Sequence, residues 1–217
     1  MIKLRVRNLK DKKEILESSD YYMNIEKAKE YKGAWDKYFK NNNPISLEIG
    51  CGKCKFIYEI AKRNPNQNYI GLERIDTVLA LGIKEIEKYE KLPNLVLINF
   101  DALDLRDIFN KEIDTLYLNF SDPWPKTRHE KRRLTSFNFL ERYDIIFKDK
   151  KVIEFKTDNT SLFEYSVVSL SKYGYIIEDF SIDLHNKKDF DNIVTEYEEK
   201  FSKKGFKIKY LKGVKSI

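Results

Sequence analysis

Apolar and polar positions alternate in blocks along most of the chain, and these blocks predict its secondary structure. Short apolar runs predict strands at 45–49, 68–72, 95–98, 115–120 and 151–155. Between them, apolar residues recur three and four positions apart, which predicts helices at 55–63, 77–89, 134–147 and 160–173. Strands joined by helices form crossover units, so the pattern predicts an α/β fold with a mostly parallel, doubly wound sheet.

The N-terminal part of the chain has a different pattern. Residues 1–44 are rich in charge, and an apolar stripe at helical spacing runs through residues 25–39. The stripe ends at the turn-forming stretch Asn41–Pro44. We therefore interpret residues 1–44 as a helical arm and residues 45–217 as the core of one domain.

The C-terminal part also departs from the alternation. Residues 175–184 and 206–211 are strand-like, and no long helix is predicted between them. We therefore predict an antiparallel edge for the sheet. In the last strand we expect Phe206, Ile208 and Tyr210 to share one face.

Composition places the chain among folded proteins. A length of 217 residues suits one domain, and 14 Phe with 14 Tyr argue against disorder. No apolar run approaches the roughly 18 residues that a membrane span requires. Charged residues occupy the N-terminal positions where a signal peptide has its apolar stretch, so we expect a cytoplasmic protein with no membrane partner.

The two cysteines, Cys51 and Cys54, form a C-x-x-C pair that raises the question of metal or redox chemistry. A closed zinc site needs four ligands, and the sequence has no second cysteine pair. The only histidines, His129 and His185, are distant in the sequence. We therefore expect no metal.

The net charge of +6 is concentrated in two segments. Residues 126–133 hold five Lys or Arg and one Glu, and the chain from Lys200 onward has seven lysines and no acid. Such runs are commonly solvated surface. Together with many aromatic residues they favour nucleic acid as a partner, because phosphates attract cations and bases stack on rings. In the first segment we expect Arg132 and Arg133 to contact phosphates.

Polar and acidic residues follow each of the first five predicted strands. They are Glu48, Gly50 and Gly52; Glu73; Asn99 and Asp101; Asp122; and Asp158. In an open α/β sheet the ligand lies beyond the carboxyl ends of the strands. Each residue alone is weak evidence, since an acid after a strand is often a helix cap. The glycine turn lacks the third glycine of a dinucleotide site, and Glu48 beside it favours a cationic nucleoside over a pyrophosphate.

These residues lie in motifs that resemble the tRNA (guanine-N(7)-)-methyltransferases, which use S-adenosylmethionine. The matching stretches are LEIGCGK at 47–53, IGLER at 70–74, NFSDPWPK at 119–126, RHEKRRL at 128–134, FKTD at 155–158 and TEYE at 195–198. The similarity extends from about Tyr31 to Phe201, and the DPWPK-x-RH stretch is its most specific part. Cys54 departs from the family, which usually has a third glycine there, and we expect so small a side chain to be tolerated.

The resemblance implies a Rossmann-like methyltransferase fold that transfers a methyl group to N7 of a guanine in the variable loop of tRNA, at position 46. It implies that Asp122 is catalytic. The implied cofactor-binding residues are Glu48, Gly50, Gly52, Glu73, Asp101 and Asp122, with Asn99 as the alternative to Asp101. The implied substrate-binding residues are Lys126, Asp158, Thr195, Glu196, Tyr197 and Glu198. Related proteins occur as monomers and homodimers, and we expect one of these states.

The chemistry suits these residues, because guanine N7 attacks with a free lone pair and needs no strong base. Asp122 can stabilise positive charge or orient the guanine, and Trp124 can stack on a base or only support its loop. Two other readings are open. One is a methyltransferase acting on an exocyclic amine, although residues 121–125 lack the double proline typical of those enzymes. The other is an RNA-binding module that has lost catalysis.

Overall fold

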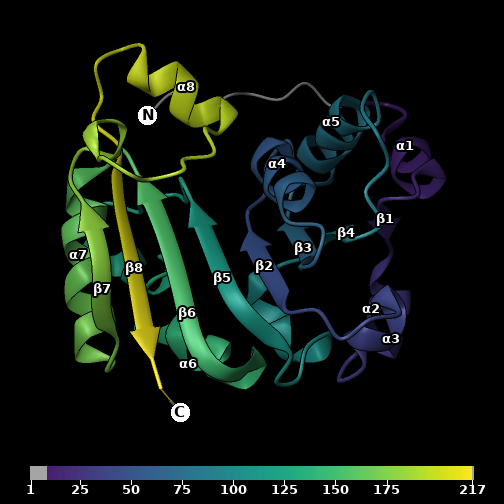
Figure 1. Ribbon diagram of the computed structural model, residues 1–217, viewed down its shortest axis with the longest axis horizontal. Coiled ribbons are helices and arrows are strands. Elements are labelled where there is room, and N and C mark those ends of the chain that lie inside the picture. The colour runs from purple at the N-terminus through teal and green to yellow at the C-terminus, as the bar shows by residue number, and fades with distance from the viewer. Residues whose placement is uncertain (1–8, 217) are drawn as a thin grey trace.

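The computed structural model describes residues 9–216, apart from the side chain of Glu196, and its centre is one mixed sheet (Figure 1). The strands lie in the order β1-β4-β3-β2-β5-β6-β8-β7. Their bounds are β1 Tyr22–Met23, β2 Ile45–Ile49, β3 Asn68–Glu73, β4 Leu95–Asn99, β5 Ile113–Asn119, β6 Phe147–Thr157, β7 Ile176–Ser181 and β8 Lys209–Lys215. The strands from β1 to β6 pair in parallel, and β8 pairs antiparallel with β6 and β7. The predicted α/β sheet with an antiparallel C-terminal edge is confirmed.

Helices cover both faces of the sheet. The α-helices are α1 Lys12–Ser18, α2 Ile25–Glu30, α3 Trp35–Phe39, α4 Lys55–Arg63, α5 Asp76–Ile86, α6 Phe137–Ile146, α7 Thr160–Lys172 and α8 Glu196–Ser202. Short 3-10 helices span η1 Ala102–Asp107, η2 Thr127–Arg132 and η3 Leu184–Asn186. Helices α1, α4 and α5 pack on one face, whereas α2, α3, α6 and α7 pack on the other. No described helix is long and apolar enough to cross a membrane.

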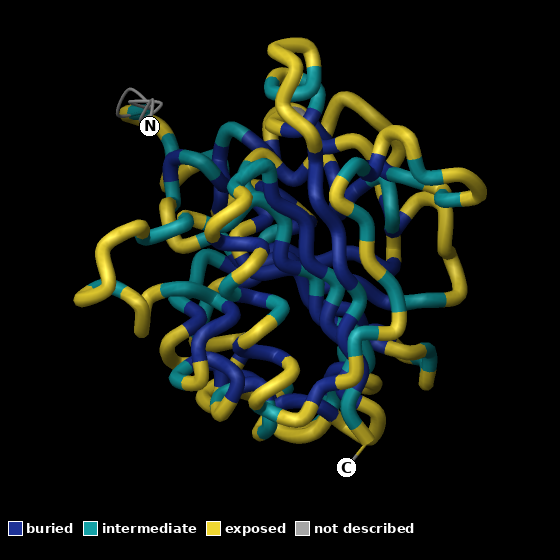
Figure 2. The backbone as a smooth tube through the Cα atoms, turned by 90° about the vertical axis from the view of Figure 1, so that its left-hand side faces the viewer, coloured by how far each residue is buried: buried dark blue, intermediate teal, exposed yellow. Residues whose placement is uncertain are grey.

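The core consists of the two apolar layers between the sheet and these helices. Successive side chains of a strand point to opposite faces, so Tyr69 joins the layer under α4 and α5 while Ile70 joins the layer on the other side. β4 is apolar on both faces in the same way, with Leu95 and Leu97 in one layer and Val96 and Ile98 in the other, as expected for a parallel strand covered by helices. Figure 2 shows the result, with buried backbone through the centre and exposed backbone in the surrounding loops.

The N-terminal arm differs from its prediction in two ways. The stripe over residues 25–39 is divided into α2 and α3, because the chain turns between them at Gly33, which has φ +75°. In addition, β1 extends the sheet by pairing with β4, and a strand of two residues has too little pattern to be predicted. The arm is fixed to the core by Trp35, which is fully buried and donates from Nε1 to the Ile108 carbonyl at 2.9 Å.

The C-terminal edge is present, but its second strand lies further along the chain than predicted. β8 spans Lys209–Lys215 because its register is set by β6, from Thr157 opposite Lys209 to Lys151 opposite Lys215. Of the three residues expected on one face, Ile208 and Tyr210 are buried. Phe206 precedes the strand and is half exposed, so that part of the prediction is wrong. Helix α8 was not predicted at all.

Candidate active site

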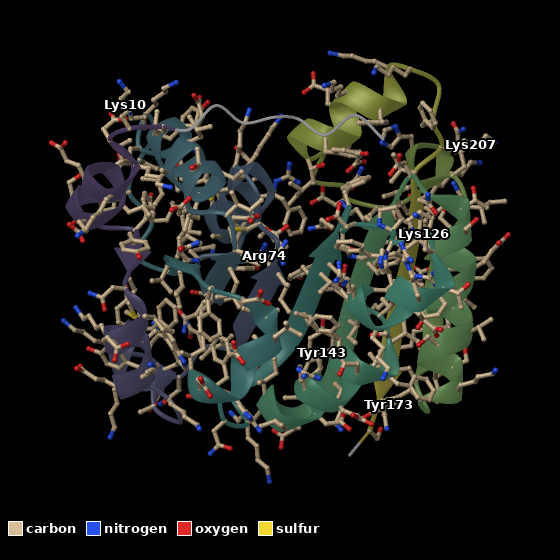
Figure 3. The ribbon with its side chains drawn as sticks, turned by 180° about the vertical axis from the view of Figure 1, so that it is seen from behind. Lys10, Arg74, Lys126, Tyr143, Tyr173 and Lys207 are labelled. Atoms are coloured by element: carbon tan, nitrogen blue, oxygen red, sulfur yellow. The ribbon has the colours of Figure 1, made fainter. Side chains whose placement is uncertain are left out.

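Two adjoining cavities open at the carboxyl ends of the central strands. The main cavity has a volume of about 680 Å³ and is lined by the residues that follow β2 to β5. The second cavity, of about 200 Å³, lies between the turn after β2 and the start of α8. Gly50, Asn119 and Phe120 line both. In Figure 3, Arg74 and Lys126 lie towards this edge of the sheet, and Tyr143 and Tyr173 lie nearer the opposite one.

The turn between β2 and α4 brings the backbone close to both cavities. Gly50 has φ +79° and Gly52 has φ +57°, conformations that residues with a Cβ rarely adopt. A Cβ on Gly50 would meet no atom within 4 Å, so the space beside this residue is open. The amides of Gly50 and Cys51 both donate to the Leu72 carbonyl, at 2.7 and 3.0 Å, which ties the turn to β3.

Cys54 occupies the position where the resemblance implied a third glycine. It has φ +64°, which is a strained conformation for a residue with a side chain. Its Sγ lies 4.0 Å from that of Cys51, and both cysteines are buried. Among the described residues, no group of three or more His, Cys, Asp or Glu side chains is arranged to hold a metal.

Glu48 is a buried carboxylate at the second cavity, with an exposed fraction of 2%. Its Oε1 accepts a hydrogen bond from Asn119 Nδ2 at 2.8 Å, whereas Oε2 has no partner among the described residues. Burial raises the pKa of Glu48 to about 7, although Asn119 and the charge of Lys156 act in the opposite direction. An unsatisfied buried oxygen beside a cavity fits a ligand that brings a hydrogen-bond donor, above all a cation.

Glu73 ends β3 and lines the main cavity. Its carboxylate accepts hydrogen bonds from the amide of Ile75 at 2.9 Å and from that of Gly52 at 3.1 Å. Burial raises its pKa, and these backbone donors oppose that rise. The two donors fix the orientation of the carboxylate, and each of its oxygens keeps a lone pair for paired ligand hydroxyls.

Asp101 and Asn99, the alternatives after β4, have different positions. Asp101 lines the main cavity and caps η1, its Oδ1 accepting from the amide of Leu103 at 3.0 Å. Asn99 does not line either cavity, and its Nδ2 donates to the carbonyls of Glu73 and Arg74 at 2.8 and 3.0 Å. The geometry therefore favours Asp101 as the ligand contact and gives Asn99 a supporting role.

Asp122 lies in the loop after β5 and lines the main cavity. This loop contains two residues with positive φ, Phe120 at 52° and Trp124 at 41°, and such strain is often found at functional sites. Trp124 also lines the main cavity, with the Arg132 guanidinium carbon 4.8 Å from its ring centroid. Asp122 and Trp124 of this loop thus line the same cavity.

The structure gives Arg133 a different role from the phosphate contact predicted for Arg132 and Arg133. Arg133 donates from Nε and Nη2 to the Trp124 carbonyl, at 3.3 and 3.1 Å, and its guanidinium carbon lies 4.3 Å from the Tyr165 ring centroid. Arg133 therefore supports the loop. Arg132 lines the main cavity together with Lys131. Lys126 and Arg128 are exposed, and neither has an acidic partner in the described part of the chain.

The residues expected on the substrate side surround the second cavity only in part. Thr195 and Tyr197 line it, and Tyr197 packs on Phe120 with ring centroids 5.1 Å apart. Burial, followed by the charges of Asp158 and Asp122, raises the pKa of Tyr197 to about 12, so these acids lie near its hydroxyl. The side chain of Glu196 lies outside the described part of the structure.

Glu198 is fully buried and lies outside the lining of both cavities. Its side chain accepts from the amide of Thr195, and Thr195 Oγ1 accepts from the amide of Glu198, a capping box that begins α8. Glu198 also accepts from His185 and Asn192, at 2.7 and 2.5 Å. The structure thus gives Glu198 a part in building the site rather than in lining it.

Sequence reasoning missed three contributors to this region. Asn119 donates a hydrogen bond to Glu48, Phe120 lines both cavities, and Lys156 is a buried amine near the end of β6. All three lie within the quoted motifs and at or next to the carboxyl end of β5 or β6, which was a usable signal. The capping-box signature Thr-x-x-Glu at 195–198 would also have predicted the start of α8.

Comparisons with known proteins identify the family of this chain. A family model described as "Putative methyltransferase" matches residues 42–211. A tRNA (guanine-N(7)-)-methyltransferase of Geobacillus sp. (strain WCH70) is 50% identical over 206 residues, covering 94% of this chain and 93% of that protein. A protein of the same name from Enterococcus faecalis (strain ATCC 700802 / V583) is 48% identical over 206 residues, with 94% and 95% covered.

Solved structures share the fold. One is described as an antibiotic-related methyltransferase, with a TM-score of 0.64 and 20% identity, covering 85% of this chain and 94% of that one. Another is a 16S rRNA (adenine(1408)-N(1))-methyltransferase from Catenulisporales acidiphilia with the cosubstrate S-adenosylmethionine, with a TM-score of 0.62 and 15% identity, covering 85% and 91%.

Fold and site together define an enzyme that uses S-adenosylmethionine as its methyl donor. Within that class, the chain belongs to the tRNA (guanine-N(7)-)-methyltransferase family.

Proposed function

We propose that this enzyme methylates N7 of the guanine at position 46, in the variable loop of tRNA. The names of relatives about 50% identical over nearly the whole chain support the reaction. The observation that carries the proposal is the adjacency of the two cavities. Glu73 and Asp122, which suit a cationic nucleoside, line the main cavity, and Tyr197 lines the second one. Phe120 lines both cavities and packs against Tyr197.

The cofactor site fits S-adenosylmethionine, which supplies a methyl group on a positively charged sulfur. The unpartnered Oε2 of Glu48 would accept from its ammonium group, and open space beside Gly50 admits the chain that links this group to the nucleoside. Glu73 would accept from the paired ribose hydroxyls, since its carboxylate is held by two backbone donors. Asp101 would contact the adenine at the far side of the main cavity.

The protein's task in the reaction is alignment and charge stabilisation. The N7 lone pair forms the new bond to the methyl carbon as the carbon–sulfur bond breaks, and the positive charge moves from sulfur to the purine. No proton has to be removed from N7, so the step needs no strong base. Asp122, on the main cavity, would face the developing charge or the N–H donors of guanine. Orientation alone can contribute about 7–11 kcal/mol.

The proposed substrate form follows from the shape of RNA. The major-groove edge of guanine is hidden in an A-form duplex, so the base must come from a loop or be extruded. The exposed cations Lys126 and Arg128, in the segment that follows Asp122, would contact phosphates around such a base. Because tRNA is the proposed substrate, we expect the enzyme to act in the cytoplasm.

Nucleoside analysis of a single tRNA transcript tests the proposal. The transcript is incubated with enzyme and S-adenosylmethionine beside two controls, one with adenine at position 46 and one with 7-deazaguanine there. We expect N7-methylguanosine from the first transcript and none from the controls. A methyl group on an exocyclic amine, or equal methylation of all three transcripts, would refute the assignment. Absence of S-adenosylmethionine binding would instead support an RNA-binding module.

A further inference from the structure

Lys156 is a buried lysine at the carboxyl end of β6, with an exposed fraction of only 5%. Its Nζ donates to Asn192 Oδ1 at 2.6 Å and to the Ile193 carbonyl at 3.1 Å, and it lies 3.7 Å from Glu198 Oε2. Burying an ammonium group is costly unless it is paired and hydrogen-bonded. Lys156 has three such partners, so we infer that its buried charge helps to hold these partners in place.

The partners of Lys156 belong to the segment that forms the substrate side of the second cavity. Asn192 and Ile193 precede Thr195, and Glu198 closes the capping box that begins α8. α8 lies beyond the carboxyl ends of β5 and β6 (Figure 1). Lys156 therefore joins the sheet to the segment that presents Thr195 and Tyr197 to the cavity.

The ion pairs between this segment and α4 are exposed. Glu199 pairs with Lys55 of α4 at 3.5 Å, and Asp191 pairs with Arg63 at 2.8 Å, with all four side chains at least 44% exposed. Exposed ion pairs contribute little, typically about 0–1 kcal/mol. Among the described ion pairs of this segment, the one between Lys156 and Glu198 is buried on both sides.

Lys156 also acts on the cofactor side of the same cavity. Its Nζ lies 5.2 Å from the centroid of Phe56, a lining residue on α4, and its charge favours the ionised form of Glu48. The other groups that act on Glu48 are Asn119 from β5, whose hydrogen bond also favours ionisation, and Glu73 from β3, which opposes it. Cys51, in the turn after β2, also interacts with the Glu48 charge.

We propose that Lys156 is a positioning residue that holds the segment from Asn192 to α8 over the second cavity. On the other side of the same cavity, its charge also favours the ionised form of Glu48. One buried cation then serves both sides of the cavity. The proposal rests on the proposed function only for its effect on tRNA. Its effects on cofactor binding and on the segment itself are independent of which RNA is methylated.

The first test is the pH dependence of S-adenosylmethionine binding, measured by calorimetry from about pH 6 to 9. Lys156→Met removes the cation and keeps most of the side-chain volume. The matched control is Lys151→Met, on the same strand, which removes another buried lysine, whose Nζ lies 2.5 Å from Asp144 Oδ1. We expect the wild type and the control to lose affinity below a midpoint near 7, the pKa of Glu48. In Lys156→Met this midpoint moves to higher pH.

A double variant guards against misfolding. Lys156→Met combined with Glu198→Gln removes both buried charges, a replacement that proteins often tolerate better than the loss of one partner. If the single variant is too unstable to measure, the double variant must still show the upward shift of the midpoint. An unchanged midpoint in a folded protein would overturn the claim about Glu48.

The second test is hydrogen exchange, followed by tRNA kinetics. We expect faster exchange in residues 187–198 of Lys156→Met than in Lys151→Met, with equal exchange in α5. Misplacing a substrate wall by about 1 Å can cost roughly 100-fold, so kcat/KM for tRNA should fall by about that factor at a pH where S-adenosylmethionine saturates. Unchanged exchange would overturn the claim about α8. If Lys156→Met changes both the pH midpoint and the hydrogen exchange, but the wild-type enzyme does not methylate the tRNA, only the proposed substrate is overturned.

Discussion

The missing side chain of Gly82 makes room for Cys54. A Cβ on Gly82, in the middle of α5, would lie 2.8 Å from Cys54 Sγ and 2.7 Å from the carbonyl carbon of Lys53. Both separations are far below van der Waals contact. The turn after β2 has Cys54 where a third glycine was expected, and α5, which packs against that turn, has Gly82. The absence of a side chain at Gly82 therefore explains how Cys54 fits there.

Gly82→Ala is expected to destabilise the protein, although alanine favours a helix over glycine by about 1 kcal/mol. The new methyl group would meet backbone atoms of the turn, and overpacking of this kind costs about 1–3 kcal/mol. The displaced turn should also weaken S-adenosylmethionine binding. Thermal unfolding and calorimetry measure both effects, with Lys84→Ala, on the same helix, as the control. Equal or higher stability of Gly82→Ala would show that the turn yields without strain.

Glu48→Gln should make the protein more stable at high pH and weaken its binding of S-adenosylmethionine. Burial raises the pKa of Glu48 from its ordinary 4.5 to about 7, so its stabilising contribution is full below about pH 4.5 and is lost as pH rises through 7. Replacing the charge should therefore raise the free energy of unfolding at pH 8 by about 1–3 kcal/mol and have little effect near pH 4.5. Denaturant titrations at both pH values test this.

The same Glu48→Gln variant should bind S-adenosylmethionine at least about tenfold more weakly, because the charge-assisted bond to its ammonium group is lost. It should also lose the pH dependence of binding near 7 that the wild type shows. Wild-type affinity in this variant would remove Glu48 from the cofactor site.

Glu73→Ala is expected to affect both binding and stability. Two hydrogen bonds to the ribose are worth roughly 2–4 kcal/mol, so affinity for S-adenosylmethionine should fall by about 30-fold or more. The amides of Gly52 and Ile75 also lose their acceptor, which should lower the midpoint of thermal unfolding. Competition between S-adenosylmethionine and adenine locates the effect. If Glu73→Ala weakens the binding of adenine, which has no ribose, as much as that of S-adenosylmethionine, the ribose assignment is wrong.

Asp122→Asn preserves the shape of the side chain and removes its charge. If the carboxylate stabilises positive charge on the guanine, single-turnover methylation should slow by about 100-fold or more. Binding of S-adenosylmethionine should change much less than the rate. Rapid-quench kinetics with saturating cofactor and tRNA measure the chemical step directly. A near-normal rate would reduce Asp122 to a structural residue of its loop.

The basic segment at residues 126–133 should contain residues with two different functions, contact with phosphates and support of the loop after β5. Changing Lys126 and Arg128 together to Ala should reduce the salt dependence of tRNA binding by about one to two phosphate contacts and leave cofactor affinity unchanged. Arg133→Ala should instead weaken cofactor binding, because the Trp124 carbonyl loses its clamp at the main cavity. Salt titrations and calorimetry on both variants distinguish these effects. If only Arg133→Ala reduces the salt dependence of tRNA binding, Arg133 contacts phosphates and Lys126 and Arg128 do not.

The chain's local pattern predicted the central strands and helices and the edge of the sheet that carries the site. Helix α4 was predicted with its observed bounds, because its apolar residues recur at helical spacing between a glycine turn and a break. Parallel strands bring their carboxyl ends to one edge, so Glu48, Glu73 and Asp122 were expected together from topology alone. Two of them, Glu73 and Asp122, line the main cavity, and Glu48 lines the adjoining one.

Only the tertiary structure decided which polar residues contact one another. The register of β8 and the pairing of β1 with β4 depend on partner strands distant in sequence, so local pattern could not set them. Likewise, Glu48 meets Asn119 and Lys156 meets Glu198 across 71 and 42 residues of chain. Sequence alone determined which groups stand at the end of each strand. Which of them bind a ligand and which hold the site together depends on long-range packing, which a one-dimensional pattern does not contain.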